Sequence, residues 1–303
     1  MAKHNDVPLY AQVMSKRITK KDGEYKQGLL IVNIVRGQRD TGNKQISLTF
    51  DLPFVISLNP SIIKRMEELE VNDIIYIKGV FTTSDIPKNT TCPKCGGVTT
   101  RKGTMVHITP IHLLKIRSNL LKDEAVDFLK ENCELSNCVT VIGTLTDDPK
   151  SFVTQHGLTL TNYTLQVGRK YRIKEDSIQT RNDFPMIRSF GRIAKSNAEA
   201  LRKDSLVAVH GVLQTRKYDK KMECVHCGES YKIPDSTMEI VPYSVEYLQN
   251  YRTKEEIERE RESTINPIQG PVLISDDKIN DSDIRNAQNA ESDIHYIEFN
   301  DGE

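Results

Sequence analysis

The chain has 303 residues, and its 42 Lys and Arg balance its 42 Asp and Glu, so the formal net charge is zero. Over the whole chain, this balance excludes a uniformly basic nucleic-acid-binding protein. The charge is unevenly divided, however: the part from Gln249 onward holds six basic and fourteen acidic residues, a net of −8, whereas residues 1–248 hold 36 and 28, a net of +8. A basic body with an acidic tail indicates nucleic acid as a partner of the body.

Composition and motifs exclude several further classes. No apolar run approaches the roughly 20 residues of a membrane helix, and the first ten residues lack an apolar signal-peptide stretch, so we expect a cytoplasmic protein with no membrane partner. The six cysteines fit free thiols or metal ligands better than a disulfide framework. We find no P-loop, Gly-rich nucleotide loop or H-E-x-x-H motif, and we therefore expect no enzymatic activity.

The first part of the chain predicts a small barrel. Strand candidates occur at residues 29–35 and 46–50, a short helix at 62–69, and a further strand begins at Ile75. A long hairpin and a last strand follow. This order is typical of a Greek-key barrel such as the OB-fold, and we assign it to residues 1–117.

A connecting helix is expected between residues 119 and 132, within a linker at 118–135. Its apolar residues recur at helical spacing. They are Leu120, Leu121, Ala125, Phe128 and Leu129.

The chain then repeats itself. Residues 74–112 align without a gap with residues 206–244, and every matched landmark lies 132 positions from its counterpart. The matched pairs are Gly79 and Gly211, Thr83 and Thr215, Cys92 and Cys224, Cys95 and Cys227, Gly96 and Gly228, and Pro110 and Pro242. We infer a duplicated domain whose second copy occupies residues 136–248. Its expected elements are strands at 139–145 and 158–167, a helix at 194–202, and a strand through Val207, Val209, Gly211 and Leu213.

The second copy carries three specific sequence blocks: V-x-x-I-G-x-L-x-x-D-P, then FGRIAKSNAEALRKDSLVAVHG, then QTRKY. Over about residues 137–247 it resembles the bacterial single-stranded DNA-binding protein family. The resemblance implies an OB-fold that coats and protects exposed DNA during replication, recombination or repair. It also implies a cytoplasmic protein of bacterial, phage or plasmid origin, acting as a homodimer or higher homo-oligomer.

The resemblance places four stacking positions on the aromatics Tyr171, Phe184, Phe190 and Tyr218. Stacking contributes roughly 1–3 kcal/mol per base and tolerates any flat aromatic face, so the lack of Trp is no obstacle. The alternative is that these rings are core residues, which applies most strongly to Phe190. The basic residues expected to contact phosphates are Arg169, Lys170, Arg172, Arg188, Arg192, Arg216 and Lys217.

The first copy is more divergent upstream of its hairpin. Arg36, Arg39 and Phe81 are its candidates for a contribution to binding. The alternative is a barrel that serves structure or dimerisation only.

The two C-x-x-C pairs have the knuckle form of zinc ribbons. A structural zinc site takes four ligands, yet each copy supplies two thiolates, so we predict one shared site that joins both hairpins. Its ligands would be Cys92, Cys95, Cys224 and Cys227. Separate or intersubunit sites completed by His107, His112 or His226, and no metal at all, remain alternatives, and Cys133 and Cys138 are treated as incidental.

Residues 249–303 are expected to form a charged helix followed by a disordered acidic tail. The family resemblance implies that an apolar tip recruits replication and repair proteins, and here Ile297 and Phe299 would supply it. The chain continues through Asn-Asp-Gly-Glu instead of finishing on Pro-Phe. The alternative is a solubilising tail that competes with DNA for the basic groove.

These observations predict an all-β protein with short helices, built of tandem OB-fold barrels, that binds single-stranded DNA. An RNA-binding or transcription-associated zinc-ribbon and OB protein is one alternative, and a structural adaptor that binds no nucleic acid is another. Competition between oligo-dT and oligo-U at matched salt distinguishes the single-stranded DNA-binding function from the RNA-binding alternative.

Overall fold

The computed structural model describes residues 4–36, 48–154, 157–169, 182–263 and 272–274, with side chains described as far as residue 259. The first repeat contains β1 (His4–Lys21), β2 (Glu24–Arg36), β3 (Thr49–Asp51), β4 (Phe54–Ser57), α1 (Pro60–Glu67), β5 (Ile74–Thr91) and β6 (Val98–Arg117). Two helices connect the repeats: α2 (Lys122–Glu131) and α3 (Cys133–Ser136). The second repeat contains β7 (Val139–Leu145), β8 (Lys150–Thr154), β9 (Thr159–Gly168), β10 (Asn182–Asp183), β11 (Met186–Phe190), α4 (Gly191–Ala200), β12 (Leu206–Glu223) and β13 (Ser230–Gln249). They are followed by α5 (Lys254–Ser263) and β14 (Val272–Ile274).

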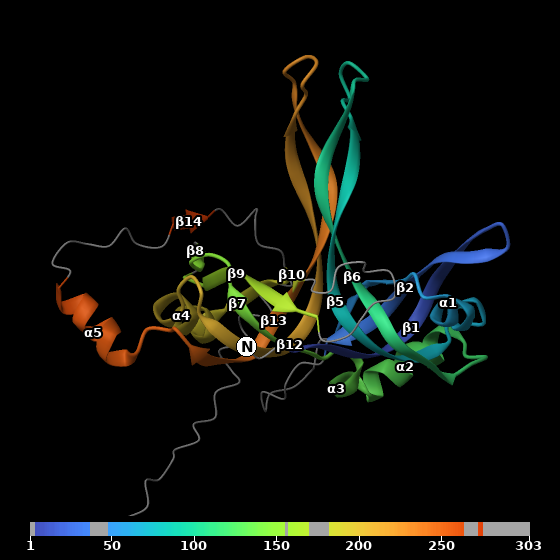
Figure 1. Cartoon of the computed structure of the whole chain (residues 1–303), viewed down its shortest axis with the longest axis horizontal. Coiled ribbons are helices and arrows are strands. Elements are labelled where there is room, and N and C mark those ends of the chain that lie inside the picture. Colours follow the sequence, from blue (N-terminus) through green and yellow to red (C-terminus); the bar gives the residue numbers. More distant parts are fainter. Residues whose placement is uncertain (1–3, 37–47, 155–156, 170–181, 264–271, 275–303) are drawn as a thin grey trace, which may run out of the picture.

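Each repeat forms a small β-barrel, and the prediction of tandem barrels is confirmed (Figure 1). In the first repeat, β1 pairs with β2 and β5, β5 pairs with β6, and β4 lies between β2 and β6. In the second repeat, β7 pairs with β9 and β12, β12 pairs with β13, and β11 lies between β9 and β13. The two strand orders are therefore equivalent.

Alternation along the strands supplies the barrel interiors. In β7, every second residue is buried, as at Val139, Val141 and Leu145, because successive side chains point to opposite faces. In β5 of the first repeat, Ile75 and Ile77 are likewise fully buried. These residues belong to one apolar cluster that extends through both repeats.

One sheet runs across both barrels. The start of β1 pairs antiparallel with β7, placing His4 opposite Ile142 and Asp6 opposite Thr140. Strand β1 was not among the predicted strands, although Val7, Leu9, Ala11 and Val13 alternate along its first half, before the basic residues of its second half. This strand joins the repeats by backbone hydrogen bonds, and the described part of the chain is thus a single assembled body.

Short helices close the barrel ends. In α1, Asn59 caps the first turn by accepting from the Ser61 N–H at 3.0 Å, and Pro60 occupies the first turn, where its lack of an N–H costs nothing. Helix α2 is shorter than the predicted 119–132, and its buried residues Ala125 and Leu129 pack against Val35 and Ile74 of the first barrel. No helix in the described ranges is long and apolar enough to cross a bilayer.

Two long hairpins leave the same side of the body and rise side by side (Figure 1). The first hairpin is formed by β5 and β6, and the second by β12 and β13. A bulge at the base of each brings Gly79 opposite Pro110 and Gly211 opposite Pro242. A Cβ atom on Gly211 would lie 2.1 Å from the Val241 carbonyl oxygen, so this close approach requires glycine.

Candidate nucleic-acid interface and metal centre

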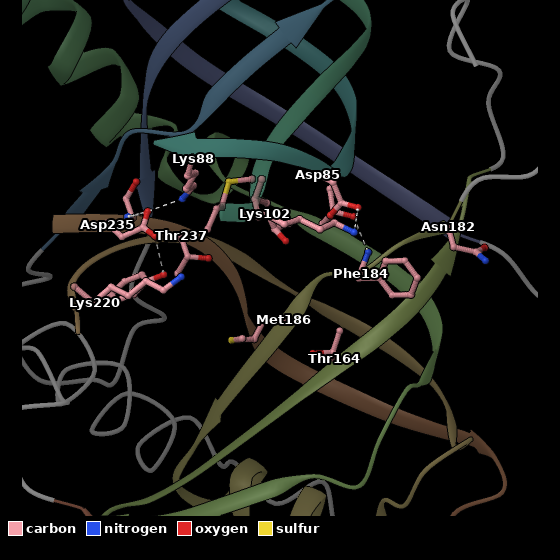
Figure 2. Close-up of a pocket in the computed structure, with 17 residues that line it drawn as sticks. Asp85, Lys88, Lys102, Thr164, Asn182, Phe184, Met186, Lys220, Asp235 and Thr237 are labelled. Carbon is pink, nitrogen blue, oxygen red and sulfur yellow. Dashed lines mark hydrogen bonds and ion pairs between the residues drawn. The ribbon is translucent and has the colours of Figure 1, made fainter. Parts of the chain in front are cut away.

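A groove of about 660 Å³ opens between the second barrel and the two hairpins (Figure 2). We call it the second-barrel groove. Its floor comes from β9 and the segment around β11, and its walls come from both hairpins. The lining residues used below are Lys88, Lys102, Phe184, Met186, Tyr218 and Lys220.

Two of the predicted stacking aromatics line this groove. Phe184 is 48% exposed, and Tyr218 on the second hairpin is half-buried. The Phe184 N–H donates to Thr83 Oγ1 at 3.1 Å, and this bond holds the backbone of Phe184 against the first hairpin. Met186 adds a further apolar side chain, 38% exposed.

Tyr218 is oriented by its neighbours. Its hydroxyl donates to Asp235 Oδ2 at 3.4 Å, and the Arg216 guanidinium lies 5.1 Å from the ring centroid. Burial, followed by the nearby Asp235 charge, raises the pKa of Tyr218 above its ordinary value. The ring therefore stays neutral over the physiological range and offers an aromatic surface in a basic setting.

Lysines enter the groove from both hairpins. Lys88 Nζ lies 2.7 Å from Asp235 Oδ1, and Lys102 Nζ lies 2.8 Å from Asp85 Oδ2. Lys220 stands exposed on the second hairpin near Tyr218. Lys102 can exchange its exposed partner Asp85 for a phosphate, because surface ion pairs are weak, whereas the partner of Lys88, Asp235, is largely buried.

Other predicted binding residues occupy the interior. Phe190 is 2% exposed and packs with Leu160, Val212 and Val241, so a base cannot reach its face in this conformation. Phe190 is thus a core residue in this structure, as the alternative to a stacking role expected. Arg188 is 5% exposed beside the buried Glu239.

Three arginines divide between internal and exposed positions. Arg169 forms a buried ion pair with Asp183, a position that the sequence alone had assigned to phosphate binding. Arg216 is partly buried, with its Nε 3.4 Å from Glu239 Oε1. Arg192 is exposed at the start of α4, and Lys217 is exposed on the second hairpin. Lys170, Tyr171, Arg172, Ile297 and Phe299 lie outside the described residues.

The first barrel carries an equivalent groove of about 600 Å³, which we call the first-barrel groove. Its floor presents Phe50, Leu52 and Phe54, with exposures of 40%, 46% and 38%. Leu52 and Phe54 lie 132 positions before Phe184 and Met186. These residues were not predicted from the sequence, although extending the repeat offset upstream of the hairpin identifies Leu52 and Phe54.

The first-barrel residues that sequence reasoning did select lie elsewhere. Phe81 is fully buried in the core. The Arg36 side chain is buried in an ion pair with Asp51 at 2.5 Å and donates to Gln214 Oε1 at 3.0 Å. Phe81 therefore supports the core of the first barrel, and Arg36 connects the two repeats. Arg39 lies outside the described residues.

The hairpin tips bring four cysteines together. The Sγ atoms of Cys92, Cys95, Cys224 and Cys227 all lie within 4.8 Å of one another. Across the tips, Cys92 and Cys227 are 3.8 Å apart and Cys95 and Cys224 are 3.6 Å apart. A tetrahedral zinc ion with Zn–S bonds of about 2.3 Å requires S–S distances of about 3.8 Å, so the four thiols fit one metal ion.

The two knuckles have the same backbone. Gly96 and Gly228 adopt φ values of +69° and +70°, and each donates its N–H to the carbonyl of the first cysteine in its pair. The Cys224 sulfur also accepts the His226 N–H at 3.4 Å, which lowers the pKa of Cys224 to about 6. A backbone donor thus favours the thiolate that a metal ion needs.

Comparison with known proteins finds a family match for the second repeat. Residues 136–259 match the model of the single-strand binding protein family. The "Single-stranded DNA-binding protein 3" of Clostridium acetobutylicum is 40% identical over 86 residues, 28% of this chain and 58% of that protein. The "Single-stranded DNA-binding protein" of Aquifex aeolicus is 26% identical over 136 residues, 45% of this chain and 85% of that protein. The chain spans about three fifths of the length of each of two Clostridium acetobutylicum relatives, the single-stranded DNA-binding proteins 3 and 2.

The whole fold also has a solved counterpart. The single-stranded DNA-binding protein from Thermus aquaticus superposes with a TM-score of 0.53 and 15% sequence identity, covering 84% of this chain and 97% of that one. At this identity the likeness shows the fold. It includes both repeats, whereas the family match begins after the first one.

Proposed function

Because residues 136–259 match the model of the single-strand binding protein family, we propose that this protein binds single-stranded DNA without sequence preference and coats exposed strands. The observation that carries the proposal is the second-barrel groove, where Phe184 and Tyr218 lie among three lysines. Replication, recombination and repair are the settings in which such strands arise. Binding, and no catalysis, is the proposed activity.

The groove provides the two interactions that a non-specific single-strand site needs. Aromatic faces stack on bases, at roughly 1–3 kcal/mol per base, and every base offers such a face. Lys88, Lys102 and Lys220 provide positive charge for the phosphates. We assign the base contacts to Phe184 and Tyr218, and the phosphate contacts to these lysines and to Lys217.

Fluorescence titration with oligo-dT of graded length tests the proposal. The affinity should fall steeply with salt, because phosphate contacts release counterions. Lys220→Glu should weaken binding and flatten the salt dependence, whereas Lys130→Glu on α2 should leave both unchanged. Affinity for oligo-dT that is absent, or that is independent of salt, would reject the proposal.

Oligo-U competition addresses the RNA-binding alternative. A site that stacks bases and contacts phosphates without reading the sugar should prefer oligo-dT at most modestly. A marked preference for oligo-U at matched salt would favour the RNA-binding function instead.

We further propose that the four-cysteine cluster holds one zinc ion per chain. The close fit of the sulfur positions to a tetrahedral site supports this assignment. The metal would crosslink the hairpin tips and has no open coordination position for catalysis. Metal analysis tests it: one zinc per chain supports the shared site, and two per chain contradict it.

Finally, we propose a cytoplasmic protein of bacterial, phage or plasmid origin that forms a homodimer or higher homo-oligomer. Its acidic tail, with Ile297 and Phe299 near the end, is the segment we propose for recruiting replication and repair proteins. Light scattering and pull-down with tail peptides test these two statements separately.

A further inference from the structure

The two grooves share their walls. The second-barrel groove includes Asp85 and Lys102, which belong to the hairpin of the first repeat. The first-barrel groove includes Arg216 and Lys217, which belong to the hairpin of the second repeat. Lys88, at the place where the hairpins meet, lines both grooves. Neither groove is complete unless the hairpins stand together.

The hairpins are joined weakly along their described lengths. Lys88 contacts Asp235 at 2.7 Å, and Lys94 contacts Glu229 at 2.6 Å, but the second pair is largely exposed, with side-chain exposures of 65% and 41%. Exposed ion pairs of this kind contribute little to stability and are screened by salt. An isolated two-stranded hairpin is also marginally stable in water. Arg101 Nη2 also donates to the Glu223 carbonyl at 2.9 Å, and the Tyr231 hydroxyl donates to Thr90 Oγ1 at 3.4 Å. These exposed or partly buried polar contacts hold the upper parts of the hairpins together only weakly.

The four-cysteine cluster supplies the strong connection. It lies at the far ends of both hairpins, with thiols of one tip 3.6 and 3.8 Å from thiols of the other. Bonds from one metal ion to all four sulfurs would fix both tips and thereby limit the separation of the hairpins below them.

We propose that metal binding at the cysteine cluster and single-stranded DNA binding in the two grooves are positively coupled. The bound zinc ion holds the hairpins in the arrangement that completes both grooves, and a strand bound between hairpins and barrels holds the cysteines in place. This inference rests on the proposed function. Because coupling between binding sites is reciprocal, DNA must raise zinc affinity by the same factor by which zinc raises DNA affinity.

The first experiment measures oligo-dT affinity of the full-length protein, loaded with zinc or stripped by a chelator. We expect the stripped form to bind about five- to fifty-fold more weakly, within the usual range of coupling between sites, and added zinc to restore the affinity. The Cys95→Ser/Cys227→Ser variant should bind as weakly as the stripped form, with or without zinc. Cys133→Ser, outside the cluster, is the matched control and should behave as the parent protein.

A second variant distinguishes loss of the metal from misfolding as the cause of weaker binding. Cys227→His keeps a four-ligand site of a type that zinc accepts, and it should retain both the metal and the oligo-dT affinity. Far-UV circular dichroism should show the barrels intact in every variant. Cobalt substitution gives a readout independent of DNA, because tetrahedral thiolate coordination produces intense visible absorption, which the Cys95→Ser/Cys227→Ser variant should lose.

The reciprocal experiment measures zinc affinity against a chromophoric chelator, with and without saturating oligo-dT. We expect the oligonucleotide to tighten zinc binding by the factor found in the first experiment. Equal oligo-dT affinity with and without zinc, or a protein that takes up no zinc, would overturn the coupling and leave the proposed function intact. Failure of both forms to bind oligo-dT would reject the proposed function as well.

Discussion

Thr83 and Thr215 occupy equivalent positions in the two repeats, and each hydrogen-bonds to a buried aspartate of the opposite barrel. The Thr215 N–H and hydroxyl donate to Asp51 Oδ1 at 2.7 and 2.9 Å. The Thr83 N–H donates to Asp183 Oδ1 at 2.9 Å, with its hydroxyl at 3.5 Å. The base of each hairpin is thus bound to the other barrel, beside the floor of a groove.

Thr215→Val should destabilise the fold by about 1.5–3 kcal/mol, because a buried carboxylate loses a hydroxyl donor. Asp51 is 2% exposed, and this burial raises the pKa of its carboxyl group. Urea denaturation measures the loss of stability, and Thr91→Val, at an exposed position on the first hairpin, is the control. Equal stability of both variants would mean that the hydroxyl contributes nothing across the interface.

Removing the stacking surface should weaken DNA binding without unfolding. Tyr218→Ala combined with Tyr171→Ala should reduce oligo-dT affinity at least about tenfold, and Phe184→Ala should act in the same direction, at roughly 1–3 kcal/mol per stacked base. Fluorescence titration measures the affinity, with circular dichroism as the folding control. Unchanged affinity in the double variant would contradict the stacking assignment.

Substitution of Phe190, by contrast, should lower the stability of the fold. Phe190→Ala removes a ring that is 2% exposed and should cost about 3–5 kcal/mol of stability. Phe184→Ala removes a ring that is 48% exposed and should cost far less. Thermal and denaturant unfolding of this pair distinguishes core from surface, and a fully stable Phe190→Ala protein would show that the ring does not support the core.

The first-barrel groove should take part when the DNA is long enough to fill both grooves. Phe54→Ala should reduce affinity for long oligo-dT by about fivefold or more and leave short oligo-dT less affected, since one stacked base contributes roughly 1–3 kcal/mol. Val71→Ala, also exposed but outside the groove, is the matched control. If both variants bind long oligo-dT equally well, the first barrel serves structure alone.

Removing the acidic tail should maintain or raise DNA affinity. The cut belongs after Ser263 because Gln249 still pairs with Leu206, and the Asn250 carbonyl accepts from Ser205. The part removed carries nine acidic and two basic residues, so its competition with DNA should be strongest at low salt. Loss of affinity on truncation would place the tail in the binding surface.

Local pattern predicted much of the fold. Alternation predicted β7 at its observed bounds, and the repeat offset of 132 residues predicted the second hairpin from the first. The spacing of the cysteine pairs, with the ligand requirement of zinc, predicted which four thiols would come together. Strand β1 was missed, although its buried residues Val7, Leu9, Ala11 and Val13 alternate along the first half of the strand.

The sequence by itself determined the duplicated β architecture, the family resemblance of the second repeat and the identity of the clustered cysteines. These depend on local periodicity and on motifs that keep their spacing along the chain. Only the tertiary structure decided which aromatics and arginines are accessible. Phe184 and Phe190 lie six positions apart, yet one is exposed in a groove and the other is buried, and Arg169 pairs with Asp183 in the interior. The reason is physical: burial depends on contacts between segments distant in sequence, and no local pattern contains them.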